Sequence, residues 1–109
     1  MIDVEFNISK KKMSLEMSGH AGSGDVGHDL VCACASILAY TAAQMAKEFE
    51  VRKQLRSKPL TELSEGQARV FVRPKEKDAD EVWHMFNTIQ TGFILLEKNY
   101  PDNVRIIRK

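Results

Sequence analysis

A histidine and a cysteine near the start of this chain have the residue types needed for nucleophilic catalysis. His20 lies in the string Gly19-His20-Ala21, and Cys32 lies in the later string Gly27-His28-Asp29-Leu30-Val31-Cys32-Ala33. A thiolate is a strong nucleophile, and an imidazole titrating near neutral pH can take the thiol proton and pass it to a leaving amine. The pair therefore predicts covalent hydrolysis, with Cys32 as nucleophile and His20 as general base.

The expected start of a helix strengthens the prediction for Cys32. Asp29 is a good N-cap residue, and if the helix starts there Cys32 occupies the third helical position. Unpaired N–H groups and the positive end of the helix dipole favour a thiolate at that position. We expect the N–H groups near Cys32 and Ala33 to receive the oxyanion of a tetrahedral intermediate. Asp29 can also orient an imidazole, although capping is the role its position favours.

Ser36 and the remaining cysteine and histidines complete the set of candidates. Ser36 lies one turn beyond Cys32 on the same helix face, where it either contacts the substrate or bonds back to a carbonyl of its own helix. Cys34 is turned about 200° from Cys32 and is predicted to be a small core residue. His28 is the rival base, and His84 is predicted to lie on the surface.

Hydropathy patterns predict the elements that position these residues. Apolar residues alternate over 2–8 and again over 13–17, which predicts a hairpin whose turn is the run Lys10-Lys11-Lys12. A glycine-rich loop over 19–27 leads into an amphipathic helix over 29–49. The apolar stripe expected on that helix is Leu30, Cys34, Ile37, Leu38, Thr41, Met45 and Phe49.

The second half of the chain repeats this alternation of strands and a helix. A short strand is expected at Leu60–Leu63, a firmer one over 68–73, a long helix from Val82 to Tyr100 stopped by Pro101, and a last strand over 104–107. The order ββαββαβ predicts an α+β fold, with two long helices packed on a mostly antiparallel sheet.

Composition limits the remaining possibilities. The chain has 109 residues, 43% of them hydrophobic, which predicts a single domain spanning residues 1–109. Its 16 basic and 15 acidic residues balance, so no direct nucleic-acid or membrane partner is expected. The N-terminus lacks the basic start and apolar run of a secretory signal, and no membrane-spanning stretch is expected. We expect a cytoplasmic protein whose cysteines are reduced.

The motif resembles that of the ribosomal-processing cysteine protease family, Prp. The matching positions are Gly19, His20, Ala21, Gly27, Asp29, Val31, Cys32, Ala33 and Ser36, with Leu30 and Cys34 as mild departures. The resemblance implies that His20 and Cys32 are catalytic and that the other motif positions support the site or bind substrate. It also implies a homodimer without a cofactor, and a ribosomal protein precursor as substrate. That substrate is a bacterial large-subunit ribosomal protein, number twenty-seven, which loses an N-terminal extension. A stripe on the last helix, off its core face, is either a dimer contact or simply carries an isolated exposed tryptophan; its residues are Trp83, Asn87, Gln90 and Ile94.

Three alternatives remain open at this point. Gly22–Gly27 spells GxGxxG and so suggests a nucleotide-binding module, although the strand before it belongs to a hairpin. A metal site from His20, His28, Asp29 and Cys32 matches no common zinc spacing. A noncatalytic ribosome-associated or RNA-binding protein would rest on the lysine turn and on Arg105, Arg108 and Lys109.

Overall fold

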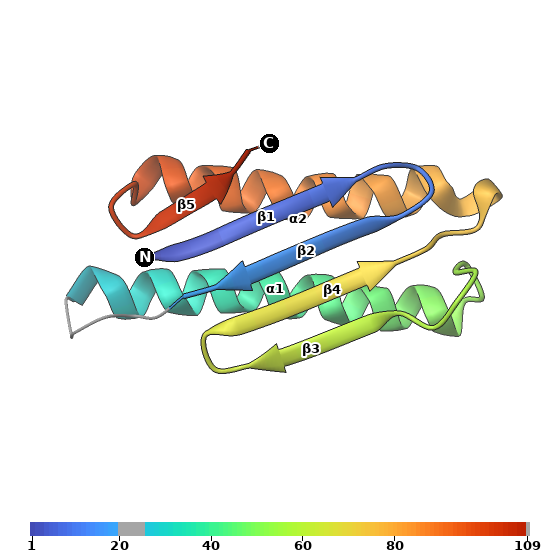
Figure 1. Cartoon of the computed structure of the whole chain (residues 1–109), viewed down its shortest axis with the longest axis horizontal. Coiled ribbons are helices and arrows are strands. Elements are labelled where there is room, and N and C mark those ends of the chain that lie inside the picture. The colour runs from blue at the N-terminus through green and yellow to red at the C-terminus, as the bar shows by residue number, and fades with distance from the viewer. Residues whose placement is uncertain (20–25, 109) are drawn as a thin grey trace.

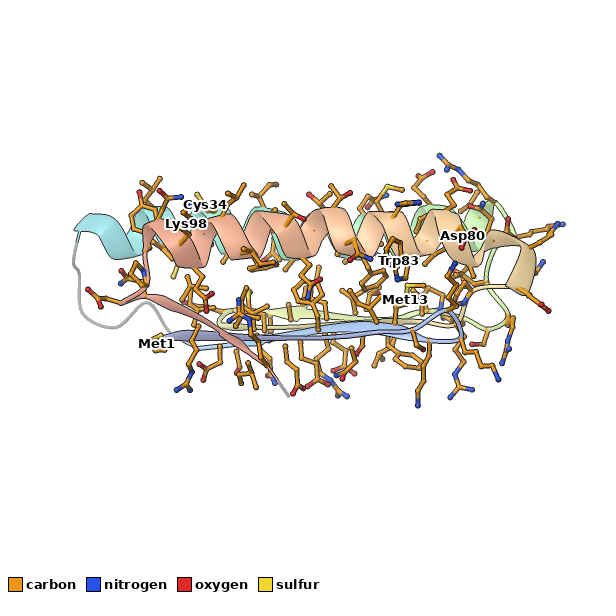
Figure 2. The ribbon with its side chains drawn as sticks, turned by 90° about the horizontal axis from the view of Figure 1, so that it is seen from above. Met1, Met13, Cys34, Asp80, Trp83 and Lys98 are labelled. Atoms are coloured by element: carbon orange, nitrogen blue, oxygen red, sulfur yellow. The ribbon has the colours of Figure 1, made fainter. Side chains whose placement is uncertain are left out.

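Two helices cover one face of a five-stranded sheet, and the other face of the sheet is uncovered (Figures 1 and 2). The computed structural model describes the backbone of residues 1–19 and 26–108 and the side chains of 1–19 and 30–108. The elements are β1 (Ile2–Ile8), β2 (Met13–Ser18), α1 (Val26–Val51), β3 (Leu60–Ser64), β4 (Gln67–Val72), a 3-10 turn (Glu76–Asp78), α2 (Ala79–Asn99) and β5 (Val104–Ile107). The expected α+β class and the order ββαββαβ are confirmed.

The sheet has the strand order β3-β4-β2-β1-β5. All neighbours are antiparallel except β1 and β5, which run parallel. In the β1–β2 hairpin Val4 pairs with Met17 and Phe6 with Leu15, so the apolar side chains of both strands point to the helices. The Ser9 N–H donates to the Lys12 carbonyl at 3.0 Å, which confirms the lysine run as the turn.

Helix α2 presents the face that its sequence predicts. Its buried residues are Ala79, Val82, Phe86, Ile89, Phe93 and Leu96. The Phe93 ring meets the Phe6 ring of β1 edge to face, with 5.8 Å between centroids, an arrangement that aromatic quadrupoles favour. The helix ends at Asn99, directly before Tyr100 and Pro101, as expected.

Helix α1 buries a different face from the one predicted. Its sheet-facing stripe is Val31, Ala35, Ala39, Ala42, Ala43, Ala46 and Phe49, all nearly inaccessible. Leu30 and Ile37 are 53% and 62% exposed and Thr41 is exposed as well, so the predicted stripe is wrong for these three residues. Alanine lets a helix approach a sheet closely, and the larger residues that the close approach excludes lie on the outer face.

The segment Leu30–Val51 of α1 is long and apolar enough to cross a membrane, which contradicts the expectation from the sequence that no such segment is present. A helix buried against a protein core passes the same test of length and composition. The alanine stripe of α1 packs on the sheet and supplies part of this apolar composition, while Leu30, Ile37 and Val51 on its outer side are exposed.

Helix α1 also starts earlier than expected, at Val26 in place of residue 29. Asp29 therefore lies inside the first turn and is not the N-cap residue. An aspartate is favoured in either position because the helix dipole acts on both, so residue type alone does not distinguish them.

Candidate active site

Cys32 lies on the wall of an open cleft at one end of the molecule. The cleft has a volume of about 370 Å³, and Cys32, Ser36 and Tyr40 line it from α1 at successive turns. Ile2, Met17 and Gly19 contribute from the β1–β2 side, and Ser64 to Gln67 contribute from the β3–β4 turn. Three segments that are far apart in sequence therefore enclose the thiol.

Gly19, the residue before His20, is fixed in the cleft by backbone contacts. Its N–H donates to the Gly66 carbonyl of the β3–β4 turn at 3.0 Å. Its φ is +135°, and a Cβ built there would lie 2.1 Å from the Met1 carbonyl oxygen. Only glycine fits such a position. The chain leading to His20 thus leaves β2 from a defined point on the cleft wall.

The structure describes the motif residues after Gly19 only in part. His20 and Ala21 lie outside the described residues, so their predicted roles are neither confirmed nor contradicted. The backbone of Gly27, His28 and Asp29 is helical, and their side chains lie outside the description. Ala33 is exposed and is absent from the cleft lining.

The helix start changes the expected environment of Cys32. Counting Val26 as the first residue, Cys32 is the seventh residue of α1. Unpaired N–H groups belong to the first four residues of a helix, and the dipole acts mainly within the first turn. The expected third-position placement is therefore wrong for this helix, and the oxyanion site at the amides of Cys32 and Ala33 stays a prediction.

Ser36 is better placed than its helical neighbours to meet a substrate. The hydroxyls of Thr41, Thr88 and Thr91 each donate to a carbonyl four residues earlier in their own helix. In the described part of the chain, no such bond is found for Ser36, and its side chain lines the cleft beside Cys32. Of the two sequence interpretations, the geometry favours substrate contact.

The two thiols face different parts of the surface. Cys34 lies in an apolar groove between α1 and α2, with Leu38, Gly92 and Leu95 among its neighbours. Figure 2 shows it on the outer side of the helix layer. It is half-buried, so the prediction of a core residue is only partly right, while the prediction that the two sulfurs cannot share a site is confirmed.

The alternative sites gain no support from the geometry. Strand β2 pairs antiparallel with both β1 and β4, which is not the parallel unit that a dinucleotide fingerprint needs. Within the described residues, no three histidine, cysteine, aspartate or glutamate side chains gather to hold a metal ion. Arg105 and Arg108 pair with Asp3 and Glu97, so two of the charges invoked for RNA binding are already neutralised.

Comparison with known proteins identifies the family. The model of the family described as Cysteine protease Prp matches residues 1–105. The chain belongs to this family. Prp is a cysteine protease, and the structure agrees with this class because Cys32 and Gly19, the residue before the motif histidine, line the same cleft.

Relatives of this Prp chain agree with the assignment over nearly its whole length. The ribosomal processing cysteine protease Prp of Staphylococcus aureus is 24% identical over 105 residues, which cover 96% of this chain and 94% of the relative. A crystal structure of the S. aureus enzyme with a substrate peptide covers both chains fully, with a TM-score of 0.72 and 24% identity. The structure of SMU.848 from Streptococcus mutans has a TM-score of 0.68 at 27% identity and covers 97% of this chain and 91% of its own.

Proposed function

We propose that this Prp chain removes the N-terminal extension of a bacterial large-subunit ribosomal protein, number twenty-seven. The observation that carries the proposal is Cys32 on the wall of the cleft, in a chain that the Prp family model matches from residue 1 to 105. The S. aureus relative is named a ribosomal processing protease, and its structures hold a substrate peptide and a covalently linked product peptide. An open cleft suits an extended peptide segment.

In the proposed reaction His20 removes the Cys32 thiol proton, and the thiolate sulfur forms a bond to the scissile carbonyl carbon. The C–N bond then breaks as the imidazolium returns the proton to the leaving amine. Water, deprotonated by the same imidazole, attacks the thioester and releases the new carboxyl terminus and the Cys32 thiol. No cofactor enters these steps.

Ser36 and the anchored Gly19 have supporting roles in this proposal. The Ser36 hydroxyl donates to the substrate carbonyl or its backbone from one turn beyond Cys32. Gly19 and its bond to Gly66 set the position from which the chain reaches His20. Ala21, Gly27, Asp29 and Ala33 complete the motif and are assigned as supporting positions.

We also propose a cytoplasmic homodimer. A reducing cytoplasm keeps Cys32 in its reactive form, and the structure has both cysteines outside disulfides. Ile37 and Leu95 line the groove that holds Cys34 and are each more than half exposed, as is Leu30 on α1, and such apolar side chains can be covered by a partner subunit. The stripe predicted from Trp83 is less suitable as a dimer contact because Trp83 is half-buried against the core.

The dimer is tested by analytical ultracentrifugation. Ile37→Lys should shift the protein to monomer, while Lys98→Glu should not.

The cleavage proposal is tested with a peptide that spans the extension junction, read by mass spectrometry. The parent should cut one bond, Cys32→Ala should cut none, and the matched variant Cys34→Ala should cut at close to the parental rate. Cys34→Ala is expected to lower the free energy of unfolding while changing the cleavage rate little, since Cys34 packs partly against the core. Continued cleavage by Cys32→Ala would reject Cys32 as the nucleophile.

A further inference from the structure

Three basic segments that are separate in sequence meet at the end of the molecule opposite Cys32 (Figure 1). They are the lysine turn at 10–12, the loop at 52–58 after α1, and residues 73–77 after β4, and we call them together the basic end. The Arg56 N–H donates to the Arg73 carbonyl at 2.7 Å, and the pairing of Met13 with Val72 brings the lysine turn beside Arg73. Lys10, Lys11 and Arg56 line one shallow hollow.

Most cations of the basic end have no carboxylate partner. Its ion pairs among described residues are Lys10 with Asp80, and Arg52 with Glu48 and Glu81. Within the described ranges 1–19 and 26–108, the basic-end residues without an ion pair are Lys11, Lys12, Lys53, Arg56, Lys58, Arg73, Lys75 and Lys77.

Arginines elsewhere in the described chain are neutralised. Arg69 pairs with Glu16 and Glu62, while Arg105 and Arg108 pair with Asp3 and Glu97. A balanced net charge therefore conceals an uneven distribution, with uncompensated positive charge collected at one end. Glu76 and Asp80 border the hollow but do not match the number of cations around it.

The chemistry of this end suits a polyanion with a regular row of phosphates. Lysine and arginine on several loops contact a phosphate backbone without reading its bases. The Arg73 guanidinium lies 5.5 Å from the centre of the half-buried Phe71 ring on the uncovered sheet face, which adds an arginine and aromatic platform beside the lysines. An anionic membrane also attracts clustered lysines and arginines, but the three segments offer no exposed large apolar side chain that would insert into it.

We propose that the basic end binds the phosphate backbone of structured RNA. The named S. aureus relative acts in ribosomal processing, where RNA is the abundant polyanion. Helix α1 separates the cleft from the basic end, because the rise along the helix from Cys32 to Val51 is about 28 Å. RNA held at the basic end therefore leaves the cleft open to a peptide. The sequence expectation of no nucleic-acid partner rested on net charge, which does not show that folding brings these segments together.

The test measures binding of a fluorescein-labelled RNA hairpin by fluorescence anisotropy. With about four phosphate contacts, affinity should fall roughly a hundredfold between about 50 mM and about 200 mM salt. Lys11→Glu with Arg56→Glu should weaken binding by more than about tenfold and lower the salt slope by about two. A second pair, Lys12→Glu with Lys77→Glu, should behave in the same way.

The matched control is Lys98→Glu with Arg105→Glu, which changes net charge by the same amount at the other end. It should retain parental affinity within about threefold. Urea unfolding verifies that each variant is folded, and peptide cleavage without RNA should be unchanged in the basic-end variants. Equal loss in both sets of variants, absence of RNA binding at low salt, or tighter binding to phosphatidylserine vesicles than to RNA would each overturn the proposal.

Discussion

Replacing Gly19 with alanine should destabilise the protein and disturb the cleft more than the same replacement at Gly92, the other glycine at which an added Cβ would meet close atoms in the described chain. The new Cβ would lie 2.1 Å from the Met1 carbonyl oxygen and 2.9 Å from the Ile2 Cα, both of which are backbone atoms. Relief requires the start of β1 to move by more than about an ångström, since ordinary contacts begin at 3.4 Å. That movement acts against the hydrogen bond from the Ile2 N–H to the Asn103 carbonyl, which has a length of 2.8 Å.

The cost can be estimated from these contacts. An L-residue at φ +135° is strained by about 1–3 kcal/mol, and a weakened backbone hydrogen bond adds about 1 kcal/mol. We expect Gly19→Ala to lower the free energy of unfolding by about 3 kcal/mol. Urea titration followed by the fluorescence of Trp83, the single tryptophan, measures this directly. Peptide cleavage should fall as well, because Gly19 precedes the proposed base.

Gly92→Ala is the matched control. Its Cβ would lie 2.7 Å from Leu38 Cδ2, the end of a flexible side chain, and alanine gains about 1 kcal/mol of helix propensity over glycine. The change in unfolding free energy should therefore stay within about 1 kcal/mol. If Gly19→Ala matched this control in both stability and cleavage, the backbone clash would not be the constraint that we describe.

Three further predictions concern other parts of the structure. Ala39→Leu should cost about 1–3 kcal/mol by overpacking the buried side of α1, while Ala33→Leu on its exposed side should change stability by less than about 0.5 kcal/mol in the same urea titration. The Ile106 N–H, which donates to the Glu97 carboxylate at 2.7 Å, and the Arg108 guanidinium lower the pKa of Glu97. The stability that ionised Glu97 contributes is therefore present above about pH 4.5 and is lost as the pH falls through the lower pKa of the folded state. Glu97→Gln lacks this contribution, so it should lose less stability than the parent between neutral pH and pH about 3. Glu65 is the charged side chain among the described cleft residues. Glu65→Gln should therefore raise the KM of peptides with basic residues a few-fold at low salt, whereas Glu62→Gln, outside the cleft, should not. An unchanged KM in Glu65→Gln would show that Glu65 does not contribute to specificity.

Strands β1, β2, β4 and β5 and helix α2 could be predicted from the sequence because each buries one face that its pattern shows directly, whereas the edge strand β3 is mostly exposed. Val4 and Leu15 alternate with polar residues, and Val82 to Leu96 keep helical spacing on one buried stripe. Helix α1 is apolar on nearly every side, so periodicity does not indicate which side meets the sheet. The alanines at 35, 39, 42, 43 and 46 were the informative signal, since small residues mark the close approach of a helix to a sheet.

The cleft was predictable only in its local part. The shared face of Cys32 and Ser36 follows from helical spacing and is confirmed by the structure. The contributions of Ile2, Tyr40 and the 64–67 turn were missed because they depend on tertiary packing. Gly66, which has φ +75°, marks a tight hairpin turn, but sequence alone does not place that turn against Gly19.

The start of α1 at Val26 changes the account of how Cys32 is activated. With α1 described from Val26, Cys32 is its seventh residue, so the field of the helix N-terminus at the thiol is weaker than it would be in the first turn. The proposed base must then supply a larger share of the activation than the sequence suggested, with the Ser36 hydroxyl as a polar group that α1 contributes to the same wall. Activity should accordingly depend on how accurately the segment after Gly19 delivers its imidazole. This explains why a glycine clamped between Met1 and Gly66 is needed at that point.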